Sequence, residues 1–247
     1  MRIKFFLRSV LVVAAKNIKI YYNKPPVIIF GILFPLFLFL AFYLGRDLEF
    51  YDFFPGLLAM SLFFTASSVG PLITPWEKQL GTYERLLSYP VTLKTIIAGD
   101  ILAGMVFGIA ISLPVSAAGL LFIPYSPNYA VLFTGILLAS FCFSSLGVLL
   151  ASPAVKSPSQ IMMFSSLVRF PLIFISGIFI PLARLSGAGR AVAFASPVTY
   201  LVDILNLGLT GKNIISFLLS IFVLILFSVI FFFTANLFHS KNHIKGL

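Results

Sequence analysis

The stretch that decides the fold runs from Ile214 to Leu237 and reads IISFLLSIFVLILFSVIFFFTANL. It contains no charged residue, and most of its side chains are aliphatic or aromatic. A helix needs about 20 mostly apolar residues to cross the hydrocarbon core of a membrane, because each residue advances it by about 1.5 Å. This stretch therefore predicts a transmembrane helix.

The composition of the whole chain agrees with a membrane protein. Hydrophobic residues make up 60% of the sequence and charged residues 10%, and the mean hydropathy is +1.09. A soluble domain carries about 25% charged residues, so this chain lacks the charge to cover a surface that faces water. The formal net charge is +10, but the basic residues lie at the ends of apolar blocks. That distribution is typical of membrane topology and not of a nucleic-acid-binding surface.

Five further segments pass the same length test. Together with Ile214–Leu237 they predict an all-α integral membrane protein with six transmembrane helices. We expect one transmembrane domain over residues 25–247, preceded by a separate segment, residues 1–24. Arg169 and Pro171 interrupt the fifth span. The first five spans are Pro26–Leu44, Phe53–Ile73, Ile101–Ile123, Tyr129–Ala151 and Ile161–Leu182.

The basic residues are distributed unevenly over the two sides that six spans define. Twelve lie on the side of the two termini and four on the opposite side. Positively charged segments are retained in the cytoplasm, so we expect both termini and the loop of residues 76–100 to be cytoplasmic, in a multi-pass protein of the plasma membrane. The twelve are Arg2, Lys4, Arg8, Lys16, Lys19, Lys24, Lys78, Arg85, Lys94, Lys156, Lys241 and Lys245, and the four are Arg46, Arg184, Arg190 and Lys212.

Residues 1–24 have the pattern of an amphipathic helix. Apolar residues recur at the i, i+3/i+4 spacing of one helix face, and basic residues occupy much of the other. Such a helix lies flat at the membrane surface, with its lysines near anionic lipid head groups, and the run Lys24-Pro25-Pro26 ends it. We therefore predict an interfacial helix in contact with lipid; a merely polar leader is the alternative. The apolar face comprises Ile3, Leu7, Val10, Ala14, Ile18 and Tyr21.

Residues 177–212, between the last two spans, fit neither a full span nor a polar loop. Short apolar pieces, one of which ends at Pro181, flank the Gly/Ser run of residues 186–189, and Pro197 interrupts the second. Neither piece is long enough to cross. We expect a re-entrant or interfacial helical hairpin on the outer side, which is tolerated where protein covers its backbone. The alternative is a longer fifth span followed by an ordinary loop.

The sequence offers no groups for ATP hydrolysis or covalent catalysis, so we expect a chain that is not an enzyme and holds no cofactor. The phosphate-binding pattern G-x-x-x-x-G-K-[ST] is absent, since the only Gly-Lys pair, Gly211-Lys212, is followed by Asn213. His239 and His243 have i, i+4 spacing but lie in a polar tail without a nearby carboxylate, so we predict no metal site. Any ATP-driven role would require a separate ATPase.

Carboxylates and one arginine bear on the alternative of a carrier driven by an ion gradient. Such carriers bury acidic residues midway along their spans. Here Asp100 lies at the expected cytoplasmic start of span three and Asp203 in the outer hairpin, which argues against a carrier. Arg169 is the one charged residue inside a span. It is a candidate for a residue that lines a transport pathway, the alternative being a position near the cytoplasmic interface.

The loop after span two carries the most specific pattern, WEKQLGTYERLLSYPVT from Trp76 to Thr92. Thr82 can cap a short helix, and Pro90 ends it. The result is a short helix at the membrane surface, with apolar residues Leu80, Leu86 and Leu87, that suits insertion into a groove on a partner protein. An ordinary amphipathic connector is the alternative.

The chain resembles the membrane subunits of ABC-2 type transporters, of the drug-resistance and polysaccharide-exporter kinds. The resemblance covers nearly the whole chain, including the basic leader, the outer hairpin with Pro181, and the run from Pro197 to Tyr200 before span six. It departs from the usual pattern at Trp76-Glu77-Lys78 and at Asp100. The loop residues that carry it are Glu77, Gly81, Thr82, Glu84, Arg85, Leu86, Leu87, Pro90, Val91 and Gly99.

The resemblance implies one half of an exporter. Two such subunits, identical or different, would form the pathway, and separate ABC ATP-binding proteins, which hold the ATP and Mg²⁺, would dock on them. The helix over Gly81–Tyr89 would be the coupling helix, and we hypothesise that Glu84 and Arg85 orient it by polar contacts with the ATPase or the leader. The apolar composition favours a lipophilic or amphipathic substrate such as a drug or lipid. The alternative substrate is a lipid-linked polysaccharide.

Overall fold

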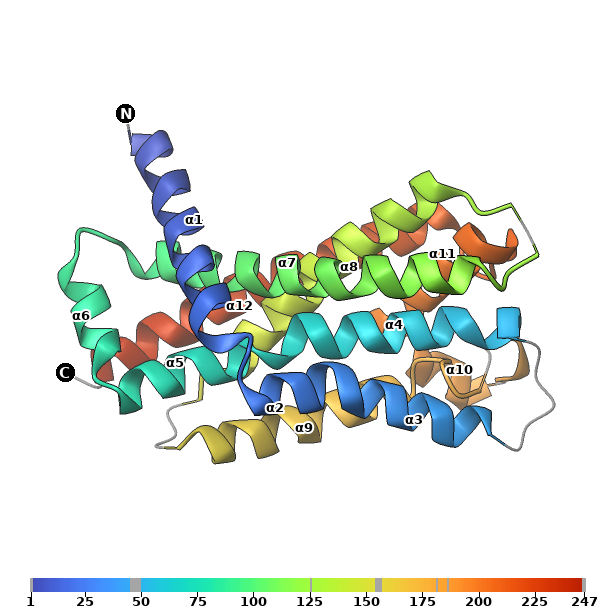
Figure 1. Ribbon diagram of the computed structural model, residues 1–247, viewed down its shortest axis with the longest axis horizontal. Coiled ribbons are helices and arrows are strands. Elements are labelled where there is room, and N and C mark those ends of the chain that lie inside the picture. The colour runs from blue at the N-terminus through green and yellow to red at the C-terminus, as the bar shows by residue number, and fades with distance from the viewer. Residues whose placement is uncertain are drawn as a thin grey trace.

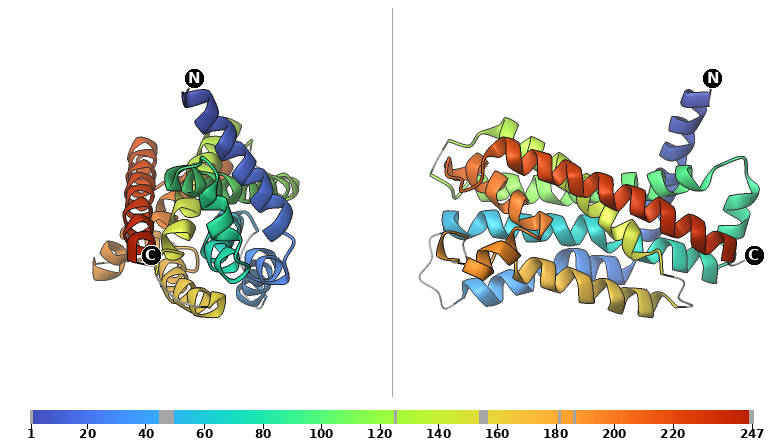
Figure 2. Two further views of the ribbon diagram at one scale, coloured as in Figure 1. Left: turned by 90° about the vertical axis from the view of Figure 1, so that its left-hand side faces the viewer. Right: turned by 180° about the vertical axis from the view of Figure 1, so that it is seen from behind.

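The computed structural model describes residues 2–44, 50–124, 126–153, 157–180, 182–185 and 187–245. Every regular element within these ranges is a helix. Most of the long helices lie side by side along one axis, whereas α1 (Arg2–Tyr21) crosses the bundle at an angle and projects from it (Figure 1). The C-terminal end of α12 and the short helix α6 (Thr82–Ser88) lie at one end of the bundle, and α10 and α11 lie toward the other (Figure 1 and the right-hand view of Figure 2).

Four described helical runs are long and apolar enough to span a membrane. The first combines α4 (Phe50–Ser68) with α5 (Gly70–Gln79), and the others are α7 (Leu93–Leu120), α8 (Tyr129–Leu150) and α12 (Phe217–Lys245). A fifth is obtained if α10 (Gly187–Ala193) and α11 (Pro197–Thr210), which are bent by 90°, count as one. These runs confirm an all-helical membrane protein.

The first expected span, Pro26–Leu44, is helical but not uniformly so. It consists of α2 (Pro25–Ile28), a π-helical segment η1 (Ile29–Leu33) and α3 (Phe34–Tyr43), with αR backbone at both junctions. A π-helical turn inside an α-helix is rare and is frequently found at functional sites. Gly31 in this segment lies close to α4, because a Cβ there would be 3.3 Å from the Ser68 hydroxyl.

The fifth expected span is shorter than predicted. Helix α9 (Pro158–Phe174) ends eight residues before Leu182, where the prediction placed its end. Gly177 adopts a positive φ of 84°, which interrupts helical geometry, and the Ser176 hydroxyl donates to the Ile173 carbonyl as the helix closes. Leu182 instead begins the 3₁₀ turn η2 (Leu182–Arg184).

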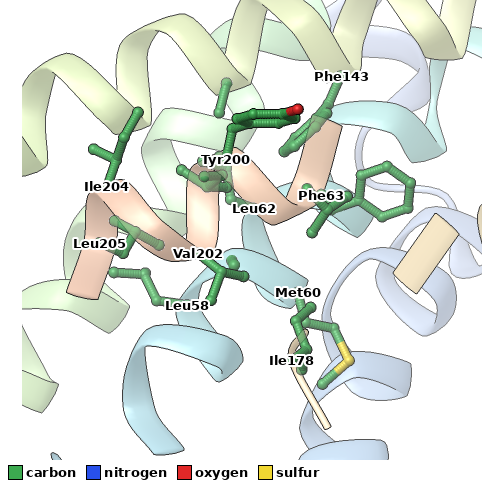
Figure 3. Close-up of a cluster of buried hydrophobic side chains, with 14 of the residues drawn as sticks. Leu58, Met60, Leu62, Phe63, Phe143, Ile178, Tyr200, Val202, Ile204 and Leu205 are labelled. Carbon is green, nitrogen blue, oxygen red and sulfur yellow. The ribbon is translucent and has the colours of Figure 1, made fainter. Parts of the chain in front are cut away.

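Helix α4 forms the centre of the bundle and is buried along nearly its whole length, whereas α12 exposes most of its apolar side chains. Figure 3 shows how α4 meets α8 and α11 in the main hydrophobic cluster. Phe63 and Phe143 contact edge to face, with ring centroids 4.9 Å apart. Because exposed apolar surface is unfavourable in water, the outer face of α12 is suited to lipid. The labelled residues of α4, α8 and α11 are Leu58, Met60, Leu62, Phe63, Phe143, Tyr200, Val202, Ile204 and Leu205.

Helices α5 and α8 cross at a pair of glycines. A Cβ on Gly70 would lie 2.7 Å from the Gly147 carbonyl carbon and 2.8 Å from the Val148 nitrogen, both backbone atoms that cannot rotate away. We expect Gly70→Ala to lower the thermal unfolding midpoint (Tm) of the purified chain in detergent, at a cost of about 1–3 kcal/mol. The matched control is Gly189→Ala in α10, where the nearest atom would be Leu185 Cδ2 at 3.7 Å. Equal Tm values for the two variants would contradict this close packing.

Candidate coupling site

Helix α6 connects α5 to α7 at the end of the bundle that also holds the end of α12 (Figure 1). It begins after Gly81, whose φ of 64° lies in the left-handed region that favours glycine. Thr82 was expected to cap the helix but is its first residue, and its hydroxyl instead donates to the Glu77 carbonyl at 3.3 Å. The helix closes before Tyr89, which is extended, and Pro90 follows directly, as predicted.

Helix α1 packs on the first half of α7. Val10, Val13 and Ala14 are buried in this contact, so part of the predicted apolar face meets protein and not lipid. A Cβ on Gly99 would lie 2.5 Å from Val13 Cγ1, which shows how closely the two helices approach. Ile3 and Leu7, from the same predicted face, are exposed.

A buried ion pair attaches α1 to α5. Lys16 contacts the carboxylate of Glu77, whose side chain is only 3% exposed. The Tyr21 hydroxyl donates to the same carboxylate at 3.5 Å, and its ring stacks on Trp76 with centroids 5.6 Å apart. Lys24 Nζ lies 4.6 Å from the Trp76 ring centroid. Lys16 therefore binds a protein carboxylate, where the sequence had suggested a lipid head group.

A second buried polar contact attaches α1 to α7. The Asn17 side-chain amide donates to Asp100 Oδ1 at 2.6 Å, and both side chains are buried. Asp100 lies within the run Leu93–Leu120 and Glu77 within the run Phe50–Gln79, but neither lies midway along its run. Both lie near the α6 end of their helices. The sequence signal for Asp100 was its departure from the pattern of the family that the chain resembles.

Tyr83 holds α6 against the rest of the protein. Its side chain is buried, and burial together with nearby carboxylates, Asp100 first, raises the pKa of its phenol to about 12. Lys78 Nζ lies 5.5 Å from the Tyr83 ring centroid. The phenol therefore stays neutral in the physiological range, as a side chain in a partly apolar setting should.

The opposite face of α6 is open. Glu84 and Arg85 are exposed, and Leu86 and Leu87 are partly exposed. Among the described residues, the polar contact between the leader and this region is made by Lys16 and Glu77. A contact between Glu84 or Arg85 and an ATPase stays a prediction. Helix α6 thus lies between α5 and α7, and each of these two helices is joined to α1 by a buried polar contact.

The outer hairpin residues lie at the other end of the bundle. Pro197 is the first residue of α11, and the preceding Ser196 donates its hydroxyl to the Leu172 carbonyl at 2.8 Å, joining α11 to α9. The Tyr200 hydroxyl donates to the Phe194 carbonyl across the bend between α10 and α11. Pro181 lies outside the described residues. An apolar hollow of about 320 Å³, lined in part by Phe174 and Val192, separates the end of α9 from α10.

Arg169 lies in the second half of α9 and is 1% exposed. Its Nε donates to the Ser165 carbonyl at 3.4 Å, and its guanidinium carbon lies 5.7 Å from the Phe64 ring centroid. The cation is thus fully enclosed by protein. None of the coupling residues contacts it among the interactions of the described chain, so the structure separates the two predicted sites.

Comparison with known proteins agrees with this architecture. Residues 8–210 match the family model of ABC-2 type transporters. Two similar proteins are the inner membrane transport permease YadH of Escherichia coli K12 and its counterpart in Shigella flexneri. Each is 27% identical over 178 residues, which cover 72% of this chain and 70% of the relative. The region that matches the family model contains α6 and the residues that attach α1 to α5 and α7. The chain belongs to the ABC-2 type transporter family, as a membrane-spanning permease subunit.

Proposed function

We propose that this chain is the membrane half of an ATP-driven exporter, powered by a separate ABC ATP-binding protein that docks on α6. Membership of the family implies such a partner. The observation that carries the proposal is the attachment of α6. Leu86 and Leu87 on this helix are partly exposed, and the preceding helix α5 is tied to α1 by the ion pair of Glu77 and Lys16. Force applied to α6 would therefore reach two helices at once.

The proposed topology has six spans, with both termini and α6 in the cytoplasm. Four spans are the long helical runs, and we add residues 25–43 and α9 as the first and fifth. Helix α9 has 17 residues, which lies at the lower limit for crossing a hydrocarbon core. The excess of basic residues at the α6 end supports this orientation. Residues 177–212 then form an outer re-entrant hairpin around the 90° bend.

The proposed substrate is lipophilic or amphipathic. The apolar hollow beside α10 and the apolar bundle support a lipophilic substrate. The relatives carry the words inner membrane in their names, which supports a location in the plasma membrane. We further propose that two copies of the chain form the pathway, because closed two-fold symmetry is the commonest arrangement of oligomers.

The test is a pull-down of the tagged chain from its native membrane, followed by an ATPase assay of what co-purifies. We expect an ATP-binding subunit to be recovered with the wild type and lost with Leu86→Asp/Leu87→Asp, because two carboxylates in an apolar groove carry a large desolvation cost. The control is Leu121→Asp/Phe122→Asp, a pair of exposed apolar residues just after the far end of α7. This control should retain the ATPase.

Two outcomes would count against the proposal. If the wild-type chain purifies alone and carries substrate into vesicles along an ion gradient, the protein is a secondary carrier. If both double variants lose the ATPase equally, or neither does, then α6 is not the docking element.

A further inference from the structure

Arg169 is a buried cation that has no counter-charge among the residues that the structure describes. One guanidinium nitrogen, Nη1, has no hydrogen-bond partner within the described chain, and Arg169 forms no ion pair there. Three of the described carboxylates are engaged elsewhere: Glu77 binds Lys16, Asp100 binds Asn17, and Asp203 accepts from two backbone amides. The other two, Asp52 and Glu84, are exposed. A buried charge is costly unless it is paired, so this guanidinium requires an anion from elsewhere.

Ser165 supplies a second unmatched group beside the first. It precedes Arg169 by four residues, so the two side chains lie one turn apart on the same face of α9. Ser165 is fully buried, and its hydroxyl oxygen has no partner among the described residues either. Buried hydroxyls in proteins are nearly always hydrogen-bonded. Two orphan donors on one helix face indicate a site for an acceptor.

The walls of this site are aromatic. The face of α9 that carries Arg169 meets Phe64 of α4, and the neighbouring Phe170 contacts both Phe64 and Phe34 of α3, at ring-centroid distances of 6.2 and 5.4 Å. An aromatic face attracts the guanidinium but leaves its in-plane N–H groups without an acceptor. The surroundings therefore favour the apolar part of a ligand and leave its polar part to Arg169 and Ser165.

The position of α9 would allow entry. The helix packs mainly against α5 and lies beside α2 and α3 at the edge of the bundle, which Figure 1 and Figure 2 both show. Its outward residues Met163 and Leu167 are 73% and 71% exposed. The π-helical segment η1 lies on the neighbouring chain segment, directly before Phe34.

We propose that Arg169 and Ser165 bind the anionic oxygen group, phosphate or carboxylate, of an amphipathic cargo molecule. A guanidinium presents parallel N–H donors that match two oxygens of such a group, and the serine hydroxyl adds a third donor. The same positive charge repels cationic amphiphiles. Among the lipophilic and amphipathic substrates proposed above, the site therefore favours anionic amphiphiles. This proposal rests on the exporter function and names the chemistry of its substrate.

The test compares three probes that share a dodecyl chain. They are dodecyl phosphate, the neutral detergent dodecyl maltoside and dodecyltrimethylammonium. We expect dodecyl phosphate, added to the chain with its co-purified ATPase in nanodiscs of phosphatidylcholine, to stimulate ATP hydrolysis and to raise the Tm of the chain. The other two probes should do neither. Equal responses to the phosphate and ammonium probes would overturn the proposal.

Variants locate the effect. Arg169→Gln should raise the concentration of dodecyl phosphate that gives a half-maximal response by about tenfold or more, because a charge-assisted hydrogen bond is lost. Arg169→Lys keeps the charge but loses the paired N–H donors, so its response should be intermediate, as should that of Ser165→Ala. The control Arg190→Gln removes an exposed arginine from α10 and should change nothing. If Arg169→Gln responds as the wild type does, Arg169 does not hold the anion. Ser165→Ala keeps the charge and so tests the site even if Arg169→Gln fails to fold.

Two further experiments distinguish a transported substrate from a resident lipid, and the binding site from the exporter function. Uptake of radiolabelled dodecyl phosphate into inverted vesicles with ATP indicates a transported cargo. Binding without uptake, together with a Tm increase in phosphatidylglycerol nanodiscs that Arg169→Gln abolishes, indicates a resident lipid and overturns the cargo assignment. The Tm arm uses the chain alone, so it reports on this site even if no ATPase co-purifies and the exporter proposal fails.

Discussion

Lys16→Met is expected to detach α1 from α5 and to abolish ATP-driven transport. The substitution keeps the length of the side chain but leaves the Glu77 carboxylate buried without its cation. Removing one partner of a buried ion pair costs about 3–5 kcal/mol, because the remaining charge is neither solvated nor paired. The Tyr21 hydroxyl, at 3.5 Å, is too distant to replace the ammonium group. Thermal unfolding and transport assays in proteoliposomes measure the two effects.

The matched control is Lys19→Met, which removes the same charge from an exposed position of the same helix. The reverse single variant, Glu77→Met, should cost less than Lys16→Met, because Lys16 is partly exposed and its ammonium group can be hydrated. The double variant should recover most of the lost stability, since an apolar pair leaves no buried charge. Additive effects in this cycle, or equal Tm values for Lys16→Met and Lys19→Met, would show that the pair does not hold α1.

The spans could be predicted because apolarity and length are local properties of a sequence. Tyr129–Ala151 was predicted and α8 covers Tyr129–Leu150, ending where the last turn loosens. The prediction for the third span began at Ile101, whereas α7 begins at Leu93. The two helical turns that the prediction left out contain Lys94 and Asp100. These charged residues do not fit an apolar span, although the helix continues through them. The predicted end of the fifth span was wrong because a glycine with positive φ, Gly177, interrupts the helical geometry within a run of apolar residues.

The short helix after the second span was predicted from the sequence, but the contacts around it were not. The resemblance to the family placed the loop around α6 correctly, including its end before Pro90. Lys16 and Glu77 are separated by 61 positions, and Asn17 and Asp100 by 83, so no local pattern joins them. The helical wheel of the leader showed an apolar face but could not show whether protein or lipid covers it. For the same reason, Arg169 was recognised as unusual while its burial was not predictable.

Gly99→Ala is expected to break the second attachment of α1 by steric conflict alone. The new Cβ would lie 2.5 Å from Val13 Cγ1, 2.6 Å from Val13 Cβ and 3.2 Å from the Val10 carbonyl oxygen, so α1 must move. The bond between Asn17 and Asp100 lies one residue further along α7 and one turn further along α1, so the shift separates donor from acceptor. Overpacking of this kind costs about 1–3 kcal/mol, to which the unpaired carboxylate adds about 1–3 kcal/mol more.

Val13→Gly is the compensating change, since it removes both Val13 atoms that the new methyl group would meet. Alone it should destabilise the chain, because it deletes a buried side chain and places glycine inside a helix. Combined with Gly99→Ala, the two losses should sum to less than their separate values by about 1–3 kcal/mol, and transport should recover in part. The measurements are Tm values and ATP-driven transport for both single variants and the double variant. Strict additivity would mean that α1 moves away from α7 without a steric conflict, in which case this contact could not transmit force between the two helices.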